Sequence, residues 1–141
     1  MKILTLGAVL LGLVVSTVPA SAHHSFAAEF DSNKPVTIQG NVTRIAWTNP
    51  HVWIYVMVPD EAGKMVNWGF EMGAPQQVRR QGWDRTTLKA GDEIIVDGFL
   101  ARDGSPRMNA RNVTWADTGM KLGAASSLEQ AIGGERDSNP R

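Results

Sequence analysis

The sequence contains no cysteine, which excludes disulfides, thiolate metal ligands and cysteine nucleophiles. It also lacks a charge imbalance, because Lys and Arg together equal Asp and Glu in number, so nothing in the composition points to nucleic acid or an anionic lipid as partner. Histidine is scarce as well. The chain has three, and two of them, His23 and His24, are adjacent.

The start of the chain has the pattern of a secretory signal peptide. Lys2 is followed by the apolar run Ile3–Val15 and then by small residues at Ala20 and Ala22. This run is shorter than the roughly 20 residues of a membrane-spanning helix, so an uncleaved membrane anchor is the weaker alternative. We expect cleavage after Ala22, a periplasmic mature protein that begins at His23, and no stable membrane span in it.

Removal of residues 1–22 leaves a mature chain of one domain's length with a charge of about −1. Composition divides it into an N-terminal segment over residues 23–34, a β domain over residues 35–117 and a flexible tail over residues 118–141. Within this tail, residues 124–132 have the composition of a short helix.

Hydrophobic alternation and turn residues predict five strands and one short helix. The helix is expected from Pro75 to Gln81, and Gly40 is expected to mark a bulge in the first strand. This order of elements predicts an all-β fold, a small OB-like Greek-key barrel with the helix between strands 3 and 4, although a small sandwich would share the order. The expected strands are Pro35–Trp47, His51–Val58, Lys64–Glu71, Glu93–Ala101 and Arg107–Trp115.

The adjacent histidines are candidate metal ligands once the leader is removed. The α-amine and imidazole of His23 would chelate one ion, and an imidazole from elsewhere would complete a histidine brace. His51 is the remaining histidine, and it opens the second expected strand. Copper suits nitrogen ligands best among the divalent first-row metals. The predicted metal site is therefore His23, His24 and His51, with copper as the cofactor.

Two other interpretations use the same residues. His24 would bind copper through its imidazole, the preceding amide and the amine, which excludes the brace. Without any metal, the histidine pair is a polar chain start, and His51 is a strand-end residue hydrogen-bonded to a backbone carbonyl.

The second expected strand has an aromatic face. Alternation places Trp53, Tyr55 and Met57 on the side opposite its aliphatic residues, which belong to the core. These three residues are candidate ligand-binding residues if the face is open. The favoured alternative is that Phe26, Phe30 and the tail pack onto it, which would also bring the histidine pair towards the second strand.

Nothing at a diagnostic spacing joins an acid, a base and a nucleophile, so catalysis is not expected. Glu71 and Asp97 are flanked by apolar residues and are candidates to pair with Arg44, Arg79 or Arg111. The scattered methionines, Met57 among them, are soft ligands for Cu(I) but more typical of core filling.

The start Ala22-His23-His24-Ser25-Phe26, followed by Gly40-x-Val42 and Asn49-Pro50-His51, resembles a family of small exported bacterial proteins of unknown function. The resemblance implies export and a pairing of the histidine start with the Asn-Pro-His motif, but no chemistry. Two functions follow as expectations. One is copper carriage or sensing, with a metal-handling or envelope protein as partner; the other is metal-free recognition of a partner protein or small ligand on the aromatic face.

Overall fold

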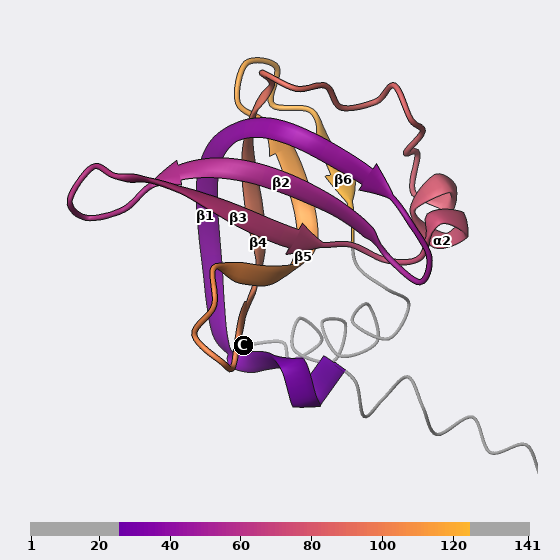
Figure 1. Cartoon of the computed structure of the whole chain (residues 1–141). Helices are drawn as coiled ribbons and strands as arrows, with labels where there is room; N and C mark the ends of the chain where they lie inside the picture. The colour runs from indigo at the N-terminus through magenta and orange to yellow at the C-terminus, as the bar shows by residue number, and fades with distance from the viewer. Residues whose placement is uncertain (1–25, 125–141) are drawn as a thin grey trace, which may run out of the picture.

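Residues 26–124 are described by the computed structural model of the protein, and β-strands account for most of them (Figure 1). A helical turn over residues 26–29 leads into the first strand. The elements are β1 (Phe30–Trp47), β2 (Val52–Pro59), β3 (Met65–Glu71), α2 (Pro75–Arg80), β4 (Glu93–Ala101), β5 (Arg107–Trp115) and β6 (Lys121–Gly123).

The strands close into a barrel of the expected OB-like order. Antiparallel pairs join β3, β2, β1, β4, β5 and β6 in that order. A parallel pairing of β3 with β5 then closes the ring, with Gly69 opposite Arg107 and Glu71 opposite Asn109. The predicted all-β barrel with a helix between strands 3 and 4 is confirmed.

The long strand β1 belongs to both halves of the barrel. Its first part pairs with β4 and its last part with β2, and Asn41 lies at the change of partner. The register shift against β2 falls between Val42 and Arg44, so the bulge lies just after Gly40 rather than at it. Gly40 instead allows close approach, because a Cβ there would lie 2.5 Å from the carbonyl oxygen of Met57.

Two boundaries differ from the expected ones. The first strand begins at Phe30 instead of Pro35, because Phe30 already pairs with Ala101 across a register irregularity. At the other end, β6 adds a sixth strand within the expected tail. The indole N–H of Trp83 donates a hydrogen bond of 2.7 Å to the carbonyl of Gly123 and so ties β6 to the loop after α2. Residues 125–132, most of the expected tail helix, lie outside the described residues.

The interior of the barrel is filled by aliphatic side chains from β2 and β4 and by larger residues from the other elements. Within residues 26–124, no helix has the length and apolar character needed to cross a membrane. The side chains with no exposed surface are Val52, Ile54, Val56, Phe70, Val78, Ile94, Val96, Met108, Ala110, Val113 and Ala124.

The turn between β4 and β5 sets the start of β5. The hydroxyl and the backbone N–H of Ser105 both donate to the carboxylate of Asp103, at 2.6 and 3.0 Å, and Arg107 adds an ion pair at 2.9 Å. These hydrogen bonds lower the pKa of Asp103 to about 2, so its carboxylate stays ionised and keeps the turn closed over a wide pH range. The turn thus fixes the start of β5 at Arg107, which pairs with Gly69 of β3.

We predict that Gly40→Ala lowers the free energy of unfolding by about 1–3 kcal/mol, because the added methyl group overlaps the backbone of β2. Equilibrium urea unfolding measures the change. Gly123→Ala is the matched control, since a Cβ there lies at an ordinary 3.5 Å from Gln81. Equal losses in the two variants would contradict the close approach.

Candidate functional site

The outward face of β2 carries all the candidate residues that lie in the described chain. Val52, Ile54 and Val56 are fully buried, whereas the residues between them are half-buried on the opposite side. The alternation predicted from the sequence therefore places the outward residues on one surface. They are His51, which directly precedes β2, and Trp53, Tyr55 and Met57.

His51 contacts a buried carboxylate. Its Nδ1 contacts Oε1 of Glu71 on β3, whose side chain is 8% exposed, while the side chain of His51 is 35% exposed. Thr48 fixes the backbone at this point by donating a 2.8 Å hydrogen bond to the carbonyl of His51. The imidazole thus contacts a buried carboxylate on the neighbouring strand.

The predicted partners of the two acidic residues are wrong. Glu71 pairs with His51, and Asp97 pairs with Lys121 at 3.6 Å. The three arginines that were the expected partners lie over aromatic rings: Arg44 at 4.1 Å from the ring centre of Tyr55, Arg79 at 5.9 Å from Trp47 and Arg111 at 5.5 Å from Phe99. The register of the hairpin of β2 and β3 identifies Glu71 as a neighbour of His51. It places Glu71 opposite Trp53 and diagonal to His51.

A lateral row of outward residues extends from this pair across the barrel closure. Trp53 is in register with Glu71, Glu71 with Asn109 on β5, and Asn109 with Phe99 on β4. Asn109 is 6% exposed, and its side-chain oxygen is buried without a hydrogen-bond partner. Sequence reasoning missed Asn109, because an isolated asparagine in a strand gives no local signal.

Phe26, the first described residue, and Phe30 cover Phe99 at the β4 end of this row. The expectation that Phe26 and Phe30 cover Trp53 and Tyr55 is wrong. The ring of Phe26 lies 5.8 Å from that of Phe30 and 6.0 Å from that of Phe99, and the three form a second apolar cluster with Ala101. The tail, the other expected cover, lies outside the described residues beyond Ala124.

The aromatic face of β2 is therefore half-exposed. The rings of Trp53 and Tyr55 stack at 6.5 Å with 22° between their planes, and the guanidinium of Arg44 lies over Tyr55. The Trp53 ring lies over Gly69 on β3, at ordinary contact distance from where a Cβ of residue 69 would be. Met57 continues the face and is also half-exposed.

The metal ligands predicted at the chain start, His23 and His24, lie outside the described residues. Within residues 26–124, no group of three His, Asp or Glu side chains is placed to hold an ion. Two of the methionines, Met72 and Met108, are buried in the core. Of the three predicted metal ligands, only His51 lies in the described part of the chain.

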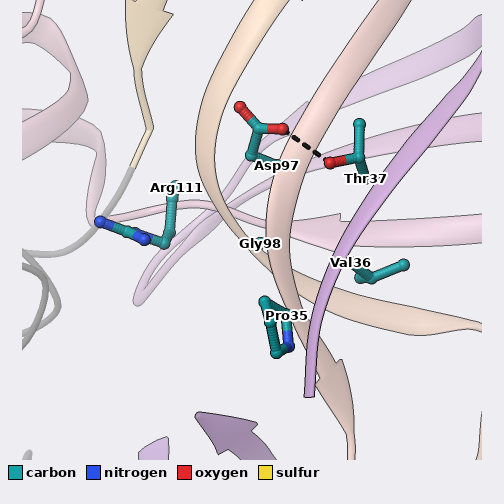
Figure 2. Close-up of a pocket in the computed structure, with 6 residues that line it drawn as sticks. All are labelled: Pro35, Val36, Thr37, Asp97, Gly98 and Arg111. Carbon is teal, nitrogen blue, oxygen red and sulfur yellow. Dashed lines mark hydrogen bonds between the residues drawn. The ribbon is translucent and has the colours of Figure 1, made fainter. Parts of the chain in front are cut away.

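A pocket of about 260 Å³ opens elsewhere, beside the antiparallel pairing of β1 with β4 (Figure 2). Its lining combines Thr37, Asp97 and Arg111 with apolar residues. The Thr37 hydroxyl donates a 2.9 Å hydrogen bond to Asp97, and Figure 2 shows Arg111 extending to the other side of Gly98. The carboxylate of Asp97 already accepts a hydrogen bond from Thr37 and pairs with Lys121. The lining of this pocket therefore shows no acid and base placed to act on the same group.

We predict that His51 and Glu71 are energetically coupled. In a double-mutant cycle, His51→Ala leaves the Glu71 carboxylate buried without its partner, so His51→Ala with Glu71→Leu should cost about 1 kcal/mol less than the two single losses added together. Urea unfolding of the four proteins at neutral pH measures this.

The matched control combines His51→Ala with Asp97→Asn, which removes a carboxylate that pairs with Lys121 on another part of the barrel. Those two losses should add within about 0.5 kcal/mol. Additivity in both cycles would show that the His51 contact contributes nothing.

Comparison with known sequences gives one match. The sequence model described as "Family of unknown function (DUF6152)" matches residues 10–110. Neither the curated proteins nor the solved structures contain a significant match to this chain.

Proposed function

The chain belongs to the DUF6152 family, whose function is unknown, and from this premise we propose that the mature protein is a periplasmic copper carrier or copper sensor. The leader is removed after Ala22, and the new amino terminus supplies the α-amine and imidazole of His23 to one copper ion. His51 supplies a further imidazole. A metal-handling or envelope protein is the partner with which copper is exchanged.

The contact between His51 and Glu71 is the observation that carries this proposal. Histidines that bind metals almost always donate their other ring N–H to a carboxylate, a carbonyl or water, which fixes the tautomer and the orientation of the ring. Glu71 holds Nδ1 of His51 in this way and directs Nε2 as the ligand atom. The side chain of His51 is 35% exposed, so an ion can reach it.

The reach of the chain supports the proposal too. Phe26 packs on Phe99, and Phe99 is separated from Glu71 by two strand spacings through Asn109. Two spacings amount to roughly 10 Å, and the three residues from Phe26 back to His23 extend over about the same distance. A fully extended amino terminus would therefore come as far as Glu71, which contacts the imidazole of His51, by way of Phe99 and not by way of Trp53 as the sequence predicted.

Copper is the proposed ion because Cu(II) binds nitrogen ligands most strongly among the divalent first-row metals. The brace through His23 and the alternative mode through His24 remain two forms of the proposal. They are separable, because His23→Ala removes a ligand from the brace and leaves all the ligands of the His24 mode in place.

We predict that His51→Ala weakens Cu(II) binding by the mature protein at least tenfold, which is about 1.4 kcal/mol. The protein is purified after export, its amino terminus is verified by mass spectrometry, and affinity is measured by competition with a chelator. Asn67→Ala, at an exposed position on β3, is the control and should bind as the wild type does. Unchanged affinity together with an unchanged EPR spectrum in His51→Ala would remove His51 from the site.

A second candidate function is metal-free recognition on the aromatic face, favoured by the half-exposed stack of Trp53, Tyr55 and Arg44. Flat aromatic side chains beside an arginine are typical of the residues that dominate binding surfaces. The ligand would be a partner protein or a small molecule in the periplasm, and Met57 would extend the contact.

For this function we predict that Trp53→Ala abolishes capture of the periplasmic partner while its free energy of unfolding falls by less than about 2 kcal/mol, since the ring is half-exposed. Lys89→Ala, at an exposed position before β4, serves as the control for capture. A loss of several kcal/mol in Trp53→Ala would show that the ring acts as core, and retained capture would exclude the face.

A further inference from the structure

The pocket beside β1 and β4 is lined in part by a residue that has no partner in the register of β4 with β5. Asp97 of β4 is opposite Asn112 of β5, but the next residue, Gly98, is opposite Ala110. Arg111 is therefore the extra residue of a β-bulge. Bulges redirect side chains and are common next to active sites. Here the bulge places Arg111 on the wall of a pocket of about 260 Å³ (Figure 2).

The backbone of the bulge is fixed on both sides. The carbonyl of Arg111 accepts a 2.8 Å hydrogen bond from the N–H of Ala124, which follows β6. On the other side, β4 comes so close that a Cβ on Gly98 would lie 2.0 Å from the carbonyl oxygen of Asn109. The position of the Arg111 backbone is therefore set by the fold, before any ligand binds.

The guanidinium of Arg111 is held by an aromatic ring. It lies 5.5 Å from the ring centre of Phe99, which is 5% exposed and packs against Phe26. A cation–π contact stabilises a positive charge without neutralising it. Within residues 26–124, the side chain of Arg111 makes no ion pair and no hydrogen bond. The pocket thus has a positive charge for which the described part of the chain supplies no counter-ion.

The carboxylate that lines the same pocket already has partners. Asp97 accepts a 2.9 Å hydrogen bond from the hydroxyl of Thr37, and its other oxygen lies 3.6 Å from the ammonium group of Lys121. Because the charges of Asp97 and Lys121 cancel, Arg111 leaves the pocket with a positive charge in excess. This excess suits a ligand with a single negative charge, since the carboxylate of Asp97 would repel a second one.

The shape of the guanidinium and the size of the pocket narrow the ligand further. A carboxylate is planar and pairs with a guanidinium through two parallel hydrogen bonds. Pro35 and Val36 add apolar surface to the lining. Pockets for drug-sized ligands have volumes of roughly 300–1,000 Å³, so a pocket of about 260 Å³ suits a ligand with only a few carbon atoms.

We propose that this pocket, which we call the Arg111 pocket, binds a short-chain monocarboxylate. The carboxylate pairs with the guanidinium of Arg111, and the alkyl chain lies against Pro35 and Val36. The Arg111 pocket shares no residue with the proposed copper site, so this inference is independent of leader cleavage and of the metal.

The test uses the full mature protein, isotope-labelled for NMR, in the presence of EDTA so that copper plays no part. Sodium butyrate is added at constant ionic strength, and the backbone amide signals are followed. We expect saturable shifts for Val36, Thr37 and Gly98. We expect the dissociation constant of butyrate to be at least tenfold higher in Arg111→Gln than in the wild type, because the ion pair is lost.

Arg79→Gln is the matched control and should bind butyrate as the wild type does, because Arg79 on α2 also lies over an aromatic ring, 5.9 Å from the centre of Trp47. Arg111→Lys keeps the charge without the paired donors, so its affinity should fall between those of Arg111→Gln and the wild type. Urea midpoints verify the fold of each variant, and Arg111→Lys decides if Arg111→Gln is unfolded. Absence of saturable shifts in the wild type, or wild-type affinity in the folded Arg111 variants, overturns the proposal.

Two further probes decide the class of ligand. Inorganic phosphate and α-aminobutyrate should each bind at least tenfold more weakly than butyrate. Asp97→Asn should not weaken butyrate binding, because it removes a negative charge near the bound carboxylate. If phosphate binds as tightly as butyrate, the pocket is a general anion site and the proposal is wrong. If α-aminobutyrate binds more tightly and loses this advantage in Asp97→Asn, the pocket takes an amino acid and the proposal is wrong as well.

Discussion

The parallel pairing of β3 with β5 is the constraint on which the rest of the molecule depends. It closes the barrel, and because side chains alternate along both strands it sets the contacts on two surfaces at once. Inward, it places Phe70 beside Met108, both without exposed surface. Outward, it places Glu71 beside Asn109. The register that completes the core thus also assembles the polar row, and a shift of one residue would exchange the two faces.

The buried polar residues of this row are costly in a chain of this size. Burial of a carboxylate is unfavourable unless charges and hydrogen bonds compensate, and an apolar residue at the same place would commonly be as stable or more so. The outward face accepts apolar residues one strand away, where Phe99 is covered by Phe26 and Phe30. Glu71 and Asn109 therefore break the pattern at the position where His51 arrives, and such local breaks are expected at functional sites.

Sequence patterns predicted the elements well because each strand carries its own alternation. The bounds of β4 and β5 agree with those expected, and the two faces of β2 are as predicted. Phe30 did not read as the first residue of a strand, because the pairing of residues 30–34 with β4 is irregular and does not show as alternation.

The neighbours of the site residues were harder to predict, because they depend on register between distant strands. Glu71 is opposite Trp53 through a hairpin, so its contact with His51 was within reach of sequence reasoning. Asn109 meets Glu71 only through a parallel pairing between strands that are separated by α2 and β4. The sequence did not indicate whether Phe26 packs on β2 or on β4. The rings of Trp53 and Tyr55 on β2 would bury Phe26 as well as that of Phe99 on β4 does.

Leader cleavage connects these observations into one order of events. In the precursor, the nitrogen of residue 23 is an amide, whose lone pair is delocalised into the carbonyl group and which binds a metal only after it loses its proton. The proposed cleavage after Ala22 would turn it into a primary amine, which offers one lone pair to a metal when deprotonated. On the proposals above, Glu71 orients His51 within the barrel, but the site lacks its first ligand until the leader is gone. The cytoplasmic precursor would then be unable to bind copper through this site, and metal binding would be confined to the compartment in which the protein acts.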